Sequence, residues 1–174
     1  SFGGENPLLL SVRSGAPVSM PGMMETVLNV GLTSKTIPRL IARSGSERFA
    51  YDSYRRLIMM YADVVMEKAL GLNKSTTGVR TKMELLLKEM KKKNKYKDDS
   101  SVSAKHWKEL SIKYLALIKK DFGVEFPDDP YSQLFGAIEA VFSSWNGKRA
   151  REYRSFENIP ETMGTAVSVQ AMVF

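Results

Sequence analysis

The fold of this chain is decided near its N-terminus, by an apolar run that ends on an arginine and by the loop that follows it: Leu8–Gly15, LLLSVRSG, and then Ser19–Asn29, SMPGMMETVLN. The apolar run predicts a buried strand over residues 8–12, and Pro7 is compatible with it because proline is tolerated where a strand begins. Pro21 suits the first turn of a helix, so a short helix is predicted over residues 21–29. The predicted order is strand, glycine-rich loop and helix.

Arg13, at the end of the predicted strand, indicates a phosphate site. Its guanidinium group is planar and permanently charged, and it can donate two parallel hydrogen bonds to phosphate oxygens. Backbone N–H groups in a glycine-rich loop and at a helix N-terminus also attract anions. The loop lacks the two common glycine-rich nucleotide-binding patterns, however. An ordinary strand–turn–helix, in which Gly15 and Gly22 permit turns and Arg13 pairs with a carboxylate, is therefore an open alternative.

The composition is that of a folded protein without cysteine chemistry. With 174 residues, of which 43% are hydrophobic, the chain can form one ordinary core or two small subdomains. The absence of cysteine excludes disulfides and thiolate metal sites, and the single histidine, His106, excludes a multi-histidine metal site. No apolar run approaches the roughly 20 residues that a membrane helix needs.

Most of the net charge of +7 comes from residues 82–97, a segment that holds seven lysines and two glutamates. Lysines near the C-terminus of a helix complement the helix dipole, so a solvated helix end is predicted here. Tyr96 is the one aromatic residue among these lysines, so a base-stacking surface for nucleic acid is not predicted.

The middle of the chain has the apolar spacing of helices, in steps of three and four residues. Ser46 can begin a helix that Gly71 ends, and the apolar residues within 83–90 and 107–118 indicate two more helices. Residues 126–130, FPDDP, break the pattern. A last helix follows, with a predicted inward face made of Leu134, Phe135, Ile138, Val141, Phe142 and Trp145.

The final segment, residues 166–174, alternates small or polar side chains with apolar ones and predicts a strand. The chain lacks an initial methionine and stops inside this apolar run. We therefore expect it to be a piece of a longer protein.

Five blocks of sequence resemble the pyruvate, phosphate dikinase family, and they occur in the order of that family. The blocks are Pro7–Leu32; Arg48–Arg56, RFAYDSYRR; Ala140–Trp145, AVFSSW; Arg149-Ala150 with Tyr153-Arg154; and Gly164–Phe174, GTAVSVQAMVF. Together they extend over nearly the whole chain, apart from a divergent region near residues 71–102.

The resemblance implies an α+β fold that is part of an ATP-grasp nucleotide-binding domain, with a small mixed sheet and a large inserted helical subdomain. Residues 1–32 would supply the first strand and the phosphate loop, and residues 33–125 the inserted helical subdomain. Residues 126–174 would supply a helix and a strand that returns to pair in the sheet.

The resemblance also implies the residues of the site. Arg13 is expected to be catalytic and to neutralise charge on the phosphates of the nucleotide. Further nucleotide-binding residues are expected to be Ser19, Met20, Gly22 and Met23 through their backbone amides, Thr26 through its hydroxyl, and Gln170 and Met172 at the adenine pocket. Met172 is equally well explained as a core residue of its strand. Glu25 stands where the family usually has aspartate, and its extra methylene leaves the role of that carboxylate open.

A whole enzyme of this family would interconvert ATP, pyruvate and phosphate with AMP, phosphoenolpyruvate and pyrophosphate, through a phosphohistidine carried on another domain. Mg²⁺ would accompany ATP, with its ligands outside this chain, and the chain alone would be inactive. A homodimer is expected, without nucleic acid or membrane partners, in the cytoplasm or in an organelle of plastid or glycosome type. Two alternatives are a phosphoenolpyruvate synthase or related water dikinase, and a non-catalytic helical interaction module.

Overall fold

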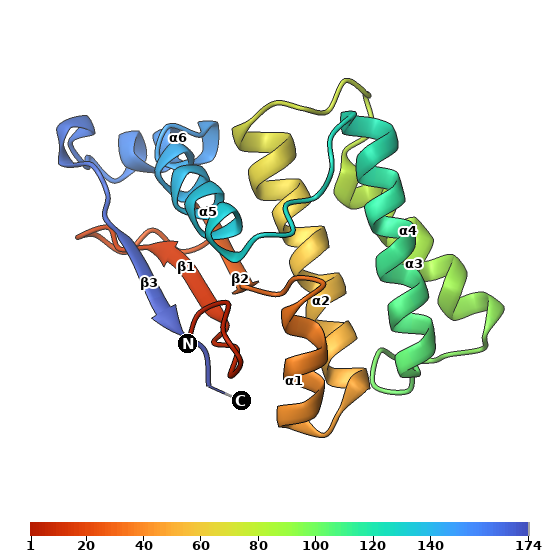
Figure 1. Ribbon diagram of the computed structural model, residues 1–174. Coiled ribbons are helices and arrows are strands. Elements are labelled where there is room, and N and C mark those ends of the chain that lie inside the picture. The colour runs from red at the N-terminus through yellow and green to blue at the C-terminus, as the bar shows by residue number, and fades with distance from the viewer. Residues whose placement is uncertain (174) are drawn as a thin grey trace.

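The computed structural model describes residues 1–173 and contains a small sheet, a group of helices beside it, and helices over the sheet (Figure 1). In chain order the elements are β1 (Leu10–Ser14), β2 (Thr26–Val30), α1 (Thr36–Ser44), α2 (Glu47–Tyr61), the π-helix η1 (Ala62–Ala69), α3 (Val79–Lys93), α4 (Ala104–Phe122), α5 (Pro130–Ser144), α6 (Lys148–Phe156), the 3-10 helix η2 (Glu161–Met163) and β3 (Val167–Ala171). The predicted α+β class is confirmed.

The sheet has the strand order β2-β1-β3, and both pairings are antiparallel. The prediction of a mixed sheet is therefore wrong for the described strands. Arg13 of β1 lies opposite Thr26 of β2 and Ser168 of β3, and residues that lie opposite each other point to the same face of a sheet. The chain thus returns to its first strand with its last one, as predicted. Phe174, the last residue of the predicted strand, lies outside the described residues.

The predicted helix over residues 21–29 is wrong. A turn at Pro21–Met23 leads instead into β2, and Gly22 has the positive φ of 72° that such a turn uses. Val27 and Val30 are fully buried, and pairing with β1 satisfies the backbone of this segment better than an isolated helical turn. The first strand is also shifted, to Leu10–Ser14. The loop after β1 therefore leads into a strand, not into the N-terminus of a helix.

Helices α1 to α4 lie together on one side of the sheet, with α2 packed against both α4 and β2 (Figure 1). The predicted start of α2 is confirmed, since the side chain of Ser46 caps the helix by accepting a hydrogen bond from the N–H of Phe49 at 3.1 Å. The helix continues through η1, and Gly71 follows it with a φ of 64°. Among residues 1–173 no helix is both long and apolar enough to cross a membrane.

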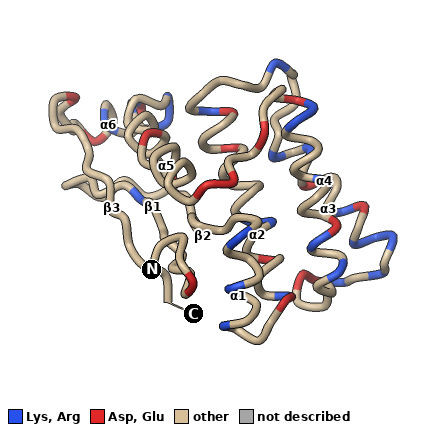
Figure 2. Tube along the Cα trace, viewed as in Figure 1, with Lys and Arg blue, Asp and Glu red and all other residues tan. Residues whose placement is uncertain are grey.

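The lysine-rich segment forms the last turns of α3 and the turn after it, at one end of the molecule (Figure 2). Lys91 pairs with Asp99 at 2.8 Å, whereas Lys92, Lys93 and Lys95 are exposed. This agrees with the predicted solvated helix end.

Helix α5 begins at Pro130, where Asp129 caps it by accepting a hydrogen bond from the N–H of Ser132 at 2.7 Å. Its predicted inward face is wrong in part, because Phe135 and Phe142 are 65% and 48% exposed. Val141 and Trp145 are buried as predicted, and the other buried residues of α5 are Gln133, Ala137 and Ala140.

The Tyr61 side chain occupies the space beside α5. A Cβ atom at Gly136 would meet the Tyr61 hydroxyl at 2.2 Å, so this position of α5 leaves no room for a larger side chain unless Tyr61 moves. Gln133 then satisfies the connecting backbone, since it accepts from the N–H of Gly31 at 2.9 Å and donates to the carbonyls of Leu32 and Pro127, both at 2.8 Å.

Two buried tyrosines of α2 are expected to make the fold less stable as the pH becomes alkaline. Burial raises the pKa of Tyr54 and of Tyr61 to about 12, while the unfolded chain releases these protons near pH 10. Their contribution to the free energy of unfolding is therefore complete below pH 10 and is lost as the pH rises towards 12. The expected decline is up to about 1.4 kcal/mol per pH unit for each tyrosine.

Urea unfolding at a series of pH values from 9 to 12 measures this decline. Tyr61→Phe should make the decline shallower, and the double variant with Tyr54→Phe should make it shallower still. An unchanged slope in the double variant would show that other groups cause the loss of stability.

Candidate functional site

The loop between β1 and β2 forms the wall of an open hollow of about 620 Å³. The hollow is lined by the end of β1, the loop and the start of β2: Arg13, Ser14, Ala16, Pro17, Val18, Ser19, Met20, Pro21, Gly22, Met24, Glu25 and Thr26. Five of the predicted site residues thus line one space, namely Arg13, Ser19, Met20, Gly22 and Thr26.

Arg13 is exposed at the edge of this hollow and has a neutral partner. Its Nη2 donates a hydrogen bond to Oε1 of Gln170 at 2.7 Å. Within residues 1–173 Arg13 makes no ion pair, so the alternative in which a carboxylate neutralises it is not observed. The full positive charge of the guanidinium therefore stays available to an anion.

The sheet explains why Arg13 and Gln170 meet. Gln170 lies two residues from Ser168 on β3, so its side chain points to the same face as that of Arg13. The structure therefore brings Gln170 to the arginine, although 157 residues separate the two in sequence.

Met172 lies towards the other end of the sheet. Its N–H donates to the carbonyl of Leu9 at 2.9 Å, and its sulfur accepts from the N–H of Asn29 at 3.3 Å. Four residues of strand separate it from Ser168, which is roughly 13 Å at the usual rise. Met172 borders a second hollow of about 430 Å³, with Leu8, Leu40 and Phe49 among its lining residues.

The loop itself is anchored by methionines. Met20 is buried and packs with Trp145 and Ala150, together with Met23 and Met24. The N–H of Met23 donates to the carbonyl of Met20 at 3.1 Å, so the amide of Met23 is used within the turn. The described structure gives no partner for the amides of Ser19, Met20 and Gly22.

Arg154 holds Trp145, the centre of this methionine cluster, in place. Its side chain is completely buried, its guanidinium carbon lies 4.0 Å from the centre of the Trp145 ring, and Nη1 donates to the Trp145 carbonyl at 2.6 Å. Nε and Nη2 donate to the two carboxylate oxygens of Glu161 at 3.2 and 2.5 Å. These hydrogen bonds hold the pKa of Glu161 below its usual range.

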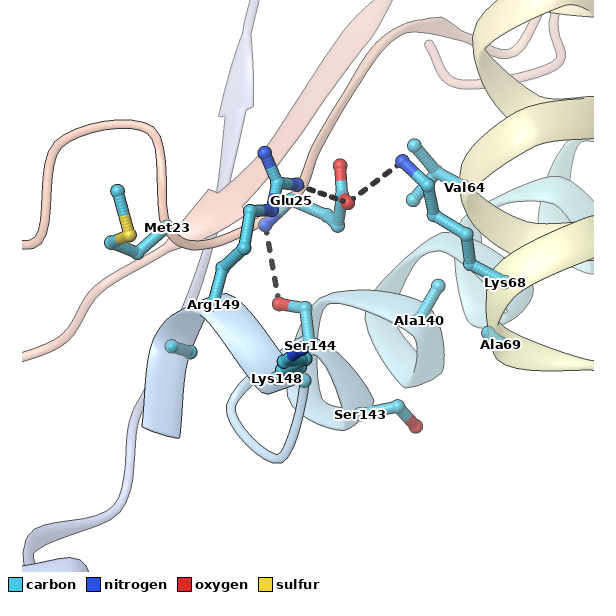
Figure 3. A pocket seen from close by; sticks show the side chains of 12 residues that line it. Met23, Glu25, Val64, Lys68, Ala69, Ala140, Ser143, Ser144, Lys148 and Arg149 are labelled. Atoms are coloured by element: carbon cyan, nitrogen blue, oxygen red, sulfur yellow. Dashed lines mark hydrogen bonds and ion pairs between the residues drawn. The ribbon is translucent and has the colours of Figure 1, made fainter. Parts of the chain in front are cut away.

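Behind the loop lies a smaller pocket of about 270 Å³, where Glu25 meets two cations from different helices (Figure 3). Oε1 of Glu25 accepts from Nζ of Lys68 at 3.0 Å and from Nη2 of Arg149 at 3.3 Å. The N–H of Glu25 donates to the hydroxyl of Ser144 at 3.2 Å.

Lys68 also contacts Asp63, with Nζ and Oδ2 3.1 Å apart. Burial by itself lowers the pKa of Lys68, but the hydrogen bonds and charges of Glu25 and Asp63 outweigh it, so the pKa is raised. Sequence reasoning noted the length of the Glu25 side chain but missed its partners. The one available signal was that a carboxylate follows the loop directly.

Comparisons with known proteins identify the family of this chain. Residues 1–174, the whole chain, match the family model described as "Pyruvate phosphate dikinase, AMP/ATP-binding domain". The chain belongs to this family.

Among its relatives, pyruvate, phosphate dikinase of Rhizobium meliloti (strain 1021) is 48% identical over 174 residues, which are 99% of this chain and 18% of the relative. Pyruvate, phosphate dikinase 1, chloroplastic, of Arabidopsis thaliana is 50% identical over 169 residues, or 97% of this chain and 16% of the relative. Pyruvate, phosphate dikinase of Clostridium symbiosum is 46% identical over 171 residues, or 98% and 18%. The chain thus spans less than a fifth of the length of these relatives.

The residues of this dikinase-family domain do not fit a metal ion. Within residues 1–173 no three His, Cys, Asp or Glu side chains are grouped so that they could hold one. Glu25 is the carboxylate next to the loop, and Lys68 and Arg149 already share its Oε1. A magnesium ion is therefore not assigned to these described residues.

The Trp145 anchor leads to a stability prediction for the domain. Arg154→Met removes a buried stacked cation and its hydrogen bonds, and it should lower the free energy of unfolding by about 3 kcal/mol. Arg154→Lys should lower it nearly as much, because an ammonium group cannot stack and bridge in the same plane. Chemical denaturation measures both.

Arg151→Met serves as the control, since Arg151 lies on the same helix with an exposed side chain. It should change the free energy of unfolding by no more than about 0.5 kcal/mol. Wild-type stability of Arg154→Lys would contradict the proposed role of the planar group.

Proposed function

We propose that this chain is the ATP-binding part of a pyruvate, phosphate dikinase. The whole enzyme would interconvert ATP, pyruvate and phosphate with AMP, phosphoenolpyruvate and pyrophosphate through a phosphohistidine on another domain. Membership of the AMP/ATP-binding family supports nucleotide binding itself. The observation that carries the proposal to particular residues is the exposed guanidinium of Arg13, which lines the loop hollow and has the neutral Gln170 as its hydrogen-bond partner within residues 1–173.

Arg13 is the proposed catalytic residue. Phosphoryl transfer depends on placing the phosphates and on neutralising the charge that develops on them, more than on covalent help from the protein. A fixed guanidinium supplies that charge, and the neutral amide of Gln170 orients it without cancelling it.

The loop is proposed to hold the phosphate oxygens through N–H groups of Ser19, Met20 and Gly22, with the hydroxyl of Thr26 beside them. Met23 was expected to act in the same way, but its amide is engaged in the turn, so its proposed part is to hold the turn. These donors come from a turn with a positive φ at Gly22, an arrangement of backbone that attracts anions without a helix N-terminus.

Gln170 and Met172 are proposed to border the adenine. The N–H of Met172 is used in pairing with β1, and residues of an antiparallel strand alternate in the side to which their backbone groups point. The backbone groups directed to the free edge of β3 are therefore those of Val169 and Ala171. Met172 would contribute its side chain, next to the apolar hollow at that end of the sheet.

The wider assignments are proposals as well. We propose residues 1–32 as the strand and phosphate-loop portion, 33–125 as the inserted helical subdomain, and 126–174 as the helix and returning strand, within an ATP-grasp domain. Mg²⁺ ligands and the phosphohistidine domain would lie outside this chain, and the chain alone would be inactive.

We further propose a homodimer with no nucleic acid or membrane partner. The compartment would be the cytoplasm or an organelle, because the relatives from Arabidopsis thaliana and Zea mays are named chloroplastic and those from Rhizobium meliloti and Clostridium symbiosum carry no compartment in their names. The comparisons support the dikinase and neither of the two alternatives, a water dikinase and a non-catalytic helical module.

Arg13→Ala in the intact protein tests the proposal. Loss of a charge-assisted contact to phosphate should weaken ATP binding about 10- to 100-fold, and turnover should fall with it. Arg13→Lys should recover little, because a single ammonium group cannot reproduce the planar pair of donors. Calorimetric titration with ATP measures the affinity.

Arg56→Ala is the matched control. Arg56 is an exposed arginine of α2 that pairs with Asp52 at 3.1 Å, and its removal should leave the affinity for ATP unchanged. Unchanged ATP affinity and turnover in Arg13→Ala would contradict the assignment of the site.

A further inference from the structure

Glu25 joins three parts of the molecule at the point where the phosphate loop ends. It lies between Met24, whose side chain packs in the Trp145 anchor, and Thr26, which begins β2 opposite Arg13. Its side chain is 19% exposed and reaches η1 through Lys68 and α6 through Arg149 (Figure 3). Its backbone N–H is held by Ser144, at the end of α5.

Lys68 reaches this position because η1 is a π-helix. The N–H of Leu70 donates to the carbonyl of Val65, five residues earlier, at 3.0 Å. In an α-helix the side chains that meet are three or four residues apart, so residues five apart point in different directions. In the wider turn Lys68 contacts Asp63, five residues earlier, and Glu25 at the same time. Wide turns of this kind are often found at functional sites.

The two carboxylates of this cluster are largely buried, whereas its cations are partly exposed: the exposed fraction of the side chain is 19% for Glu25 and 8% for Asp63, against 44% for Lys68 and 62% for Arg149. Asp63 is buried and accepts from Lys68 at 3.1 Å and from Arg80 at 3.5 Å, so its charge is balanced within the helical side of the molecule. Glu25 is the one carboxylate that links these helices to the loop. Because both cations are partly exposed, each ion pair alone is weak, but a largely buried carboxylate that contacts two cations and a backbone anchor forms a network, which holds its position better than an isolated surface pair.

We propose that Glu25 is a positioning residue, which fixes the end of the phosphate loop relative to Arg13 through its contacts with Lys68 and Arg149. This inference rests on the proposed function of the loop. In this role Glu25 acts by ordering the turn that presents the amides of Ser19, Met20 and Gly22, at the border of the hollow that these residues line. The helices of the insertion thereby contribute to nucleotide binding through Lys68.

The test uses the intact protein and the non-hydrolysable ATP analogue AMP-PNP. Glu25→Gln keeps the shape of the side chain and removes its charge, and it should weaken AMP-PNP binding about fivefold. Amide hydrogen exchange of residues 16–24 should become about tenfold faster, whereas exchange in β1 and β3 should not change. Glu25→Asp keeps the charge with a shorter reach and should give intermediate values.

Lys68→Met removes the cation that pairs with Glu25 and so tests the same contact. It should weaken AMP-PNP binding, and adding Glu25→Gln should bring little further loss, because residues that act through one contact are not additive. Glu125→Gln is the matched control: it breaks an exposed ion pair of 2.8 Å with Lys119, away from the loop, and should alter neither measurement.

The outcomes separate this inference from the function on which it rests. Wild-type binding by Glu25→Gln, with weakened binding by Arg13→Ala, would overturn the positioning role alone. Wild-type binding by both variants would overturn the phosphate site and this inference with it. Faster exchange throughout the sheet of Glu25→Gln would show that Glu25 merely stabilises the fold, and would also overturn the inference.

Discussion

The site depends on one constraint, the antiparallel pairing of β1 with a neighbour on each side. β2 follows directly in sequence, but β3 comes from the far end of the described chain, and only this second pairing brings Gln170 to Arg13. Once β1 is fixed between them, Thr26, Arg13 and Ser168 form a row across one face of the sheet. The loop then leaves and rejoins the sheet beside that row, so the hollow opens next to the guanidinium group.

Each side of the molecule contains a tryptophan covered by a buried arginine. In the helical group, Arg55 lies 4.2 Å from the centre of the Trp107 ring and pairs with Asp52 and Asp99, both at 2.8 Å. Beside the sheet, Arg154 covers Trp145. A buried guanidinium is tolerated only where its donors are satisfied, and both groups meet that condition. Each guanidinium thus covers one ring and also bonds to another segment, Arg55 to Asp99 and Arg154 to Glu161.

Local signals in the sequence predicted what local interactions decide. Two such signals are the cap at Ser46 and the break over residues 126–130, and the helix that follows each of them was predicted correctly because it depends on neighbours in sequence. The helix predicted over 21–29 was wrong because Pro21 is a local signal, whereas β2 is decided by pairing with β1 and by burial of Val27. Phe135 was assigned to the core by its spacing, but it is 65% exposed, and the neighbouring Gly136 lies against the Tyr61 side chain.

In the candidate site, too, the sequence predicted some residues and missed the contacts between distant segments. The exposed charge of Arg13 could be inferred from its place after an apolar run. Gln170, which contacts Arg13, was predicted as a site residue through family resemblance. The contacts of Glu25 could not, because Lys68 lies 43 residues away and Arg149 lies 124 residues away, and the π-helix that aims Lys68 has no recognised pattern in sequence.

The return of β3 to β1 has a consequence for the order of events during synthesis. A ribosome produces Arg13 before Gln170, its hydrogen-bond partner on β3, which follows 157 residues later. Contacts so distant in sequence form slowly, because a long segment of chain must be ordered before they are gained. If the loop binds phosphate as proposed, the nascent loop is therefore expected to reach its binding conformation only after the helices have emerged and the last strand has docked.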